Sequence, residues 1–112
     1  MKNNNCIFCK IISGDIPKEF AYEDADVVAF EDINPQAKVH LLIIPKTHVE
    51  DFFEARNPEV HMKIVHALHH LIEKKGLMGK GYKLEVNGGG AQVVPHLHFH
   101  LMGPVGVFKK SS

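Results

Sequence analysis

Three histidines occupy every second position near the end of the chain, as His96, His98 and His100. In an extended strand, side chains two residues apart lie on one face, about 6.6–6.8 Å from each other. Three imidazoles would therefore line a single face, while the apolar residues of the pattern would enter the core. Packing alone does not explain three such groups in a row, so we predict that this array carries the chemistry of the protein. The apolar residues of the pattern are Leu97, Phe99 and Leu101.

Two kinds of chemistry could use these imidazoles. In the first, histidines of one strand and a neighbouring strand bind a catalytic zinc ion with an open position for water, as in metal-dependent hydrolases. In the second, one neutral histidine attacks phosphorus as a nucleophile, while its neighbours orient it, bind phosphate and protonate the leaving group. A glycine-rich turn, Gly88–Gly90, and Gln92 lie upstream and could hydrogen-bond phosphate oxygens, although such a turn also suits a plain hairpin. These residues by themselves leave both chemistries open.

The composition is that of one ordinary globular domain. The chain has 112 residues, of which 45% are hydrophobic and 23% charged, and this allows a single domain with a real core. Thirteen Lys and Arg balance thirteen Asp and Glu, so the chain lacks the basic charge that holds nucleic acid polymers. No apolar run approaches the roughly 18–20 residues that cross a bilayer, and the first residues lack the apolar stretch of a signal peptide. We therefore expect a cytoplasmic protein that binds neither nucleic acid polymers nor membranes.

Two helices are expected from the spacing of apolar residues and from capping signals. A short helix covers residues 6–12 and ends at Ser13-Gly14. A long helix begins after Asn57, a favourable N-cap that is followed by proline, and its apolar stripe runs to residues 74–76. These helices account for about a quarter of the chain, and strands are expected in much of the remainder.

Five strands are expected between and after the helices. Residues 39–44 form a continuous aliphatic run ended by Pro45, which is typical of a central strand buried on both faces. Turn signals connect the other runs, so we predict an antiparallel sheet and an α+β fold. Pro95 removes one ladder donor, which indicates that the last strand begins there or lies at an edge. The other strands are expected at residues 20–23, 27–31, 82–86 and 93–102.

Four segments of the chain together resemble the histidine triad (HIT) family, most closely its nucleotide-binding branch of nucleoside phosphoramidate hydrolases. The resemblance spans about residues 6–103 in the same order, and the alternation of His with apolar residues is highly specific. It implies a single HIT domain over residues 1–112, folded from about 6 to 108, with a five-stranded antiparallel sheet, one short helix and one long helix. The segments are CIFCKII (6–12), AFEDINPQA (29–37), HLLIIPKTH (40–48) and HLHFHLM (96–102).

The resemblance implies an enzyme that hydrolyses or transfers purine nucleoside 5′-monophosphate derivatives. Typical substrates carry an amine or acyl leaving group on AMP, and the reaction passes through a covalent nucleotidyl-histidine. His98 matches the family's nucleophile, with its other ring nitrogen oriented by a backbone carbonyl. His100 and His40 match the flanking histidines, which hold the protonation pattern and contact phosphate or the leaving group. No organic cofactor is implied.

The resemblance also assigns a nucleotide-binding set, which includes His98 and His100. Asp32 matches the acid that holds the ribose hydroxyls, Gln92 matches a glutamine near phosphate, and Asn87 matches an asparagine of the site. Without the family, Asp32 would be interpreted as a solvated turn residue and the apolar members as core. Those apolar members, which match the walls around the base, are Phe8, Ile11, Phe30 and Ile33.

Two cysteines three positions apart, Cys6 and Cys9, are typical of half a zinc site or of a redox pair. The resemblance is to family members that complete a structural zinc site with two histidines, which correspond here to His48 and His96. Two thiolates and two imidazoles form a closed tetrahedral site, and this suits a structural ion better than a catalytic one. The alternative is a pair of reduced, buried thiols.

The chain departs from the branch at its C-terminal end. Position 93 is Val where close relatives place Ser or Thr against the leaving group, so protonation would come from His100, water or the substrate. Residues 103–106 also differ from the usual tail, which in the family's two-fold dimers reaches toward the partner's site. The resemblance implies a homodimer. Because the tail differs, the leaving-group specificity stays open. A nucleotide-binding regulatory protein with weak turnover is the alternative that Val93 favours.

Overall fold

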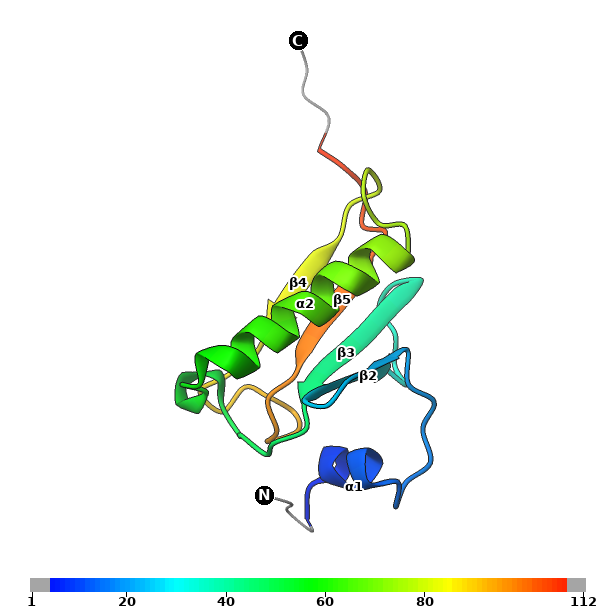
Figure 1. The fold of residues 1–112 in the computed structure, drawn as a ribbon. Helices are drawn as coiled ribbons and strands as arrows, with labels where there is room; N and C mark the ends of the chain where they lie inside the picture. The colour runs from blue at the N-terminus through cyan, green and yellow to red at the C-terminus, as the bar shows by residue number, and fades with distance from the viewer. Residues whose placement is uncertain (1–4, 109–112) are drawn as a thin grey trace.

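The computed structural model describes residues 5–108, and Figure 1 traces them through two α-helices and five strands. The expectation that both ends of the chain lie outside the folded part falls mostly on residues 1–4 and 109–112, outside the described residues. In chain order the elements are α1 (Ile7–Ser13), β1 (Tyr22–Glu23), β2 (Val27–Glu31), β3 (Val39–Pro45), the 3-10 helix η1 (Phe52–Glu54), α2 (Pro58–Lys74), β4 (Lys83–Val86) and β5 (Phe99–Gly103).

The five strands form one sheet in the order β1-β2-β3-β5-β4, and every neighbouring pair is antiparallel. β3 is the central strand and is buried along nearly its whole length, as its aliphatic run predicted. β5 lies between β3 and β4, so His100 faces Leu42 on one side and Glu85 on the other. The prediction of an α+β fold with a five-stranded antiparallel sheet, one short helix and one long helix is confirmed.

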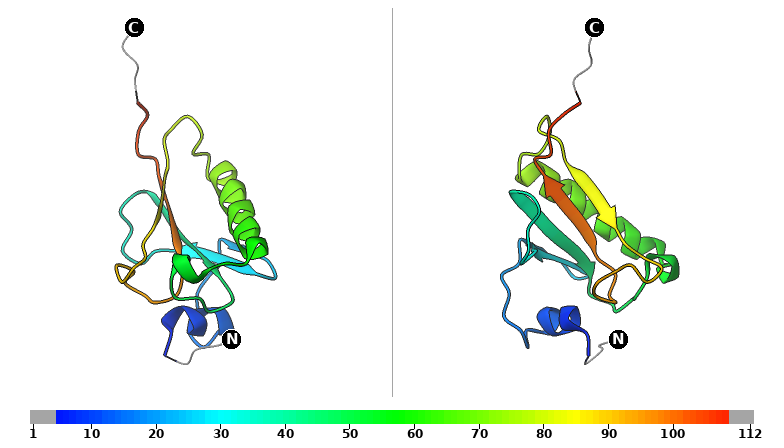
Figure 2. Two further views of the ribbon diagram at one scale, coloured as in Figure 1. Left: turned by 90° about the vertical axis from the view of Figure 1, so that its left-hand side faces the viewer. Right: turned by 180° about the vertical axis from the view of Figure 1, so that it is seen from behind.

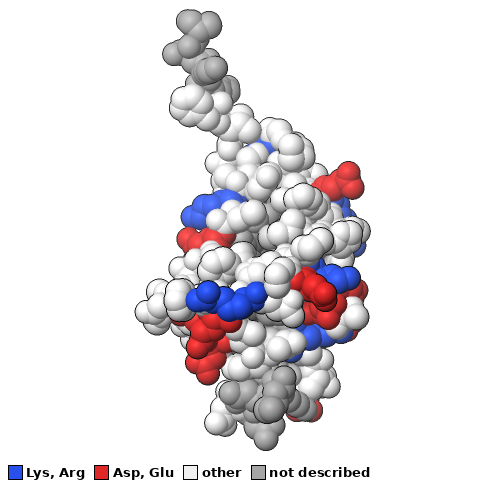
Figure 3. Space-filling view, turned by 60° about the vertical axis from the view of Figure 1, so that its left-hand side comes forward, with Lys and Arg blue, Asp and Glu red and all other residues white. Residues whose placement is uncertain are grey.

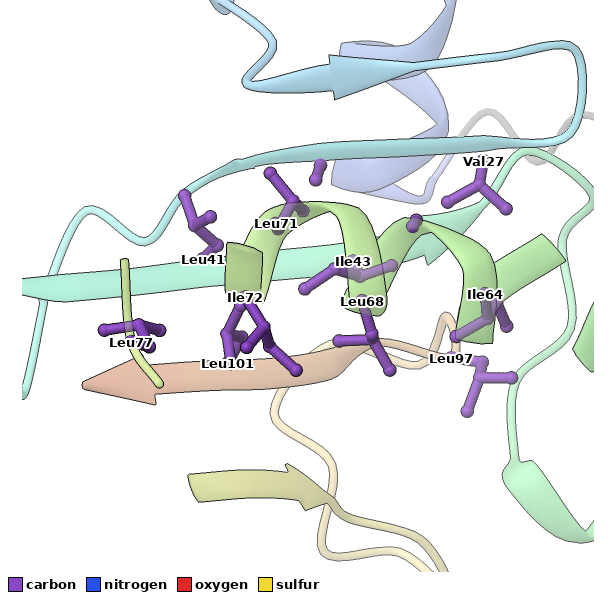
Figure 4. Packing of buried hydrophobic residues seen from close by; sticks show 12 residues of the cluster. Val27, Leu41, Ile43, Ile64, Leu68, Leu71, Ile72, Leu77, Leu97 and Leu101 are labelled. Atoms are coloured by element: carbon purple, nitrogen blue, oxygen red, sulfur yellow. The ribbon is translucent and has the colours of Figure 1, made fainter. Parts of the chain in front are cut away.

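The long helix α2 covers one face of the sheet, and the two further views of Figure 2 show it there apart from α1. The helix begins where sequence analysis expected, since the Asn57 side chain accepts a hydrogen bond from the Glu59 amide at 2.9 Å. Figure 4 shows buried side chains of α2 packed among those of the sheet strands. Each fully buried leucine or isoleucine contributes about 2 kcal/mol relative to an exposed one. The sheet residues of this cluster include Val27, Leu41, Ile43 and Leu101.

The opposite face of the sheet packs against α1. Because strand side chains alternate between faces, Leu42 and Ile44 of β3 point away from α2 and contact Phe8 and its helix instead. The helix ends at Gly14, whose φ of 88° is the left-handed conformation that closes a helix at low cost for glycine. The short helix is thus held by one face of the sheet and leaves that face only partly covered.

The last strand begins later than predicted. It starts at Phe99 and not at Val93, because Pro95 has no amide proton and the Leu97 amide donates to the Val49 carbonyl at 2.6 Å, outside the ladder. Among the three histidines, only His100 lies within the strand. The alternation of the side chains nevertheless persists, because Leu97 belongs to the α2 cluster together with Leu101. β1 is also shorter than predicted, at two residues.

The surface carries charges of both signs. Figure 3 shows acidic and basic side chains next to each other on the displayed face, in keeping with the formal net charge of zero. No helix of the described residues combines the length and the apolar character that a membrane span requires.

Candidate active site and metal centre

A cavity of about 420 Å³ opens on the sheet face opposite α2. Its walls come from α1, from β2 and β4 near their ends, and from β3 and β5, so segments distant in sequence meet there. Most of the residues expected to bind a nucleotide lie in these walls. They are Phe8, Ile11, Phe30, Asp32, Ile33, Asn87, His98 and His100.

A backbone carbonyl fixes the orientation of the His98 ring. Its Nδ1 lies 2.9 Å from the carbonyl oxygen of His96, and a carbonyl only accepts, so Nδ1 carries the proton. In the neutral imidazole this leaves the lone pair on Nε2. The ring is 6% exposed and meets the edge of Phe8, with the ring centroids 5.1 Å apart. The arrangement provides one oriented, basic nitrogen in the wall of the cavity.

A second chain of hydrogen bonds orients His100 through His40. The Gln36 amide donates to His40 Nδ1 at 3.0 Å, so the proton of neutral His40 is on Nε2. That nitrogen lies 2.9 Å from Nδ1 of His100 and 3.4 Å from Oδ2 of Asp32. With its Nδ1 accepting, His100 carries its own proton on Nε2.

Burial holds His100 in this neutral form. Desolvation is the largest cause that lowers its pKa below the ordinary value, and the neighbouring His98 and His40 lower it further. The carboxylates of Glu85 and Asp32 act in the opposite direction. His40 is 4% exposed and lies behind the cavity wall, in contact with the wall residues His100 and Asp32. The three expected catalytic histidines therefore lie together, as a basic nitrogen beside a neutral hydrogen-bond donor.

Gln92 and the glycine-rich turn do not reach the cavity. Gln92 donates from Nε2 to the Glu50 carbonyl at 2.9 Å and accepts from the Gly90 amide at 3.0 Å. The Gly89 amide, which we expected to be available to phosphate, donates instead to Oδ2 of Asp51 at 2.7 Å. The turn is thus bound to the segment before η1, and this contact between distant residues leaves no sequence signal.

Several wall residues were not predicted. Glu85 lines the cavity two positions before Asn87, and the strand alternation expected for residues 82–86 was a signal that places both on one face. Lys18 lies over the ring of Phe30, with Nζ 5.6 Å from the centroid, and no periodicity indicated it. Val93, identified as a departure from the family, also lines the cavity.

A second cluster joins α1 to the segment before β5. The ligand atoms of Cys6, Cys9, His48 and His96 all lie within 4.8 Å of one another. Nδ1 of His96 lies 3.3 Å from Cys6 Sγ and 3.6 Å from Cys9 Sγ. It lies 3.2 Å from Nδ1 of His48. The corners of a tetrahedral zinc site with thiolate and imidazole ligands are about 3.3–3.8 Å apart. The donor set and its spacing fit that ion.

A hydrogen bond orients the His96 imidazole of this cluster as a metal would require. His96 Nε2 donates to the Pro45 carbonyl at 2.8 Å, so the lone pair of Nδ1 points at the two sulfurs. His48 Nδ1 lies 3.3 Å from Cys9 Sγ. Its buried Nε2 makes no hydrogen bond to the described residues 5–108 and lies 3.9 Å from Glu50 Oε2. Burial lowers the pKa of His96 to about 4, which keeps the ring neutral. All four predicted metal ligands are brought together.

Comparison with known proteins identifies the family. The HIT domain model matches residues 13–106. Protein HitA of Neisseria gonorrhoeae is 41% identical over 104 residues, covering 89% of this chain and 96% of that protein. The 14 kDa zinc-binding protein of Zea mays is 42% identical over 102 residues, covering 87% and 80%. The chain belongs to the HIT family.

A solved structure agrees with this assignment. The HIT family hydrolase from Clostridium thermocellum superposes with a TM-score of 0.88 at 42% identity, covering 97% of this chain and 98% of that one. The resemblance inferred from the triad and the cysteine pair is thereby confirmed at the level of family and fold.

The buried His96 predicts a pH-dependent stability for the metal-free protein. Its folded pKa of about 4 lies below the ordinary value of 6.5, so between these values the unfolded chain binds the extra proton. The free energy of unfolding should therefore fall by about 2 kcal/mol as the pH drops from about 7.5 to about 5. Urea unfolding with chelator and reductant measures this change.

The control for this measurement is a pair of substitutions. His96→Gln removes the titrating group and should flatten the pH dependence by that amount, whereas His69→Gln, on the exposed side of α2, should leave it as in the wild type. Equal pH dependence in all three proteins would show that His96 titrates normally in the folded state.

Proposed function

We propose that the protein hydrolyses or transfers purine nucleoside 5′-monophosphate derivatives of the phosphoramidate or acyl-nucleotide type, through a nucleotidyl intermediate on His98. The observation that carries the proposal is the hydrogen bond from His98 Nδ1 to the His96 carbonyl, which leaves Nε2 as the basic nitrogen at the cavity. Membership of a family with relatives described as hydrolases supports it.

The reaction divides into two displacements at the α-phosphorus. In the first, His98 Nε2 forms a bond to phosphorus as the bond to the amine or carboxylate leaving group breaks. In the second, water or another acceptor takes the nucleotidyl group and releases the histidine. His100 donates from Nε2 to the phosphoryl oxygen or the leaving group. Because Val93 has no hydroxyl, an amine leaving group takes its proton from His100, water or the substrate.

The nucleoside would lie at the α1 and β2 end of the cavity. Phe8 and Phe30 meet edge to face there, with centroids 5.7 Å apart, and offer apolar walls to a purine together with Ile11 and Ile33. Asp32 Oδ1 accepts from the Asn34 amide at 2.9 Å, which holds the carboxylate in position for the ribose hydroxyls. For Gln92 to reach phosphate, its bond to the Glu50 carbonyl has to break.

Specific observations support two alternative functions. The exposed Val93 at the cavity favours a nucleotide-binding regulatory protein with weak turnover, since one leaving-group donor is missing. Oxygen and nitrogen atoms of Asp32, His40 and His100 lie within 4.8 Å of one another, which is the geometry a metal-dependent hydrolase would use. The mutual hydrogen bond of the two histidines favours the metal-free nucleophile over that alternative.

We also propose a structural zinc ion at Cys6, Cys9, His48 and His96. The fit of the donor atoms and the zinc-binding relative from Zea mays support it. When bound, the ion supplies a cross-link between α1 and the segment that carries the triad. The two cysteines are free thiols in this structure, and a reducing compartment such as the cytoplasm suits them.

Turnover should depend on His98. With an adenosine 5′-phosphoramidate that releases a fluorescent amine, His98→Ala should lower kcat/KM by at least about 10³-fold, because the covalent route is lost. Steady-state and burst kinetics measure this loss, and circular dichroism and AMP binding show that the fold and the cavity remain.

Three results would contradict this assignment. Full activity in His98→Ala would remove the nucleophile, and immediate loss of activity on adding a chelator would favour the metal-dependent hydrolase. AMP binding by wild-type protein without any turnover would favour the regulatory protein.

Zinc content should depend on the cysteine pair. Protein purified with reductant and without chelator should contain about one zinc ion per chain, and the double substitution of Cys6→Ser with Cys9→Ser should lose it and unfold at lower temperature. Elemental analysis and thermal unfolding measure these changes, with His69→Gln as the matched control. Metal-free wild-type protein, or zinc retained without the cysteines, would contradict the site.

We propose a homodimer, which the family resemblance implies, and exposed apolar side chains at the β4 edge of the sheet support it. β4 is the last strand of the sheet, and Tyr82 and Leu84 on or next to it are 41% and 46% exposed. Met62 and Val65 of α2 are exposed as well. Sedimentation should give about twice the chain mass, and Leu84→Glu should shift it toward the monomer, whereas Met78→Glu should not. A monomeric wild type would contradict the dimer.

A further inference from the structure

The cavity carries an acidic residue, Glu85, at its β4 end. Its charged wall residues are Lys18, Glu31, Asp32 and Glu85. The first three lie before, within or just after β2, whereas Glu85 belongs to β4 at the opposite edge of the sheet. In the antiparallel ladder Glu85 lies directly across from His100. Its carboxylate acts on His100 electrostatically, against the effect of burial.

The order of the strands determines which part of the proposed substrate lies at each end of the cavity. In the proposed function, ribose lies at Asp32 beside β2 and phosphorus at His98 and His100, near β5. A nucleotide extended across the sheet then carries the group on the far side of phosphorus toward β4. That group is the leaving group, and Glu85 is the charged residue of the cavity wall that lies there.

Glu85 is also free to act on a ligand. Its side chain is 43% exposed, and the cation paired with it, Lys83, lies 3.9 Å away and is itself 55% exposed. Such a long, solvated pair contributes little and is easily exchanged. The one cation in the cavity wall, among the described residues, is Lys18, which lies over Phe30 at the nucleoside end. The β4 end of the cavity therefore presents a carboxylate whose ion pair with Lys83 is long and solvated.

We propose that Glu85 is a specificity-determining residue that selects leaving groups bearing a positive charge. This inference rests on the proposed function. The favoured substrate class is a nucleoside 5′-phosphoramidate whose amine carries a second, protonated amino group at the end of a short aliphatic chain. The phosphorus–nitrogen bond still breaks at the first, uncharged nitrogen, and the distal ammonium contacts Glu85. Anionic leaving groups are disfavoured by the same carboxylate.

Matched adenosine 5′-phosphoramidates test this selection. The amines are 1,4-diaminobutane, n-pentylamine and 4-aminobutanoate, which place a cation, a methyl group or an anion at similar distances from phosphorus. The wild type should show kcat/KM about three- to tenfold higher for the cationic than for the neutral substrate, and lower still for the anionic one. The preference should weaken as salt concentration rises.

Two variants separate a local effect of Glu85 from the overall charge of the cavity. Glu85→Gln should bring the cationic-to-neutral ratio of kcat/KM to about one. Glu31→Gln removes a carboxylate from the other end of the same cavity and should keep the wild-type ratio. The ratio is the readout, so a general change in activity does not imitate the effect.

The outcomes distinguish this inference from the function on which it rests. Turnover of all three substrates with a wild-type ratio near one, or with a ratio unchanged in Glu85→Gln, overturns the role of Glu85 and leaves the proposed function standing. An equal loss of preference in Glu31→Gln overturns it as well, because the selection would then come from net charge. Absence of turnover with every substrate overturns both.

Discussion

A single residue, His96, links the two sites of this protein. Its carbonyl accepts the proton of His98 Nδ1, while its imidazole is held by the Pro45 carbonyl and faces the two cysteines. These contacts lie in the segment before β5, which starts at Phe99, and in that segment Pro95 has no amide proton to donate to a ladder. The orientation of the proposed nucleophile therefore depends on the same backbone that positions the proposed metal ligand.

The protonation of the histidines follows from their fixed backbone partners. Gln36 donates to His40, and the carbonyls of Pro45 and His96 accept from His96 and His98, so each ring has a defined tautomer. Burial then favours the neutral form of His96 and His100 by removing water from the charged state. The neutral His100 therefore provides a hydrogen-bond donor at the cavity, beside Nε2 of His98.

The two faces of the sheet differ: one packs against α2 and the other carries the cavity. The face under α2 is closed by aliphatic packing and gives the domain its stability. The other face is covered by α1 only in part, and the uncovered remainder is the cavity. Strand order arranges that cavity from Asp32 near β2 to Glu85 on β4, with His100 between them. In the proposed function, the nucleotide and its leaving group contact residues that belong to different strands.

Periodicity and capping determined much of this fold from the sequence alone. The alternation of histidines with Leu97, Phe99 and Leu101 placed the two sets on opposite sides, and Asn57 located the start of α2, because both signals are local. The resemblance to the HIT family then brought the triad, Asp32 and the cysteine pair into one hypothesis. In the structure, Asp32, His98 and His100 line one cavity. The cysteines lie beside His48 and His96. The roles of these residues in binding and catalysis stay predictions.

Tertiary structure decided the contacts that depend on pairing between distant segments. Gln92 is bound to Glu50, and the Gly89 amide to Asp51, through a contact with the segment before η1 that no local pattern encodes. The late start of β5 depends on the bond from Leu97 to Val49, across nearly half the chain. Glu85 enters the cavity because β5 inserts between β3 and β4. Periodicity specifies the face of a strand, whereas its neighbours and register come from the free energy of packing the whole sheet.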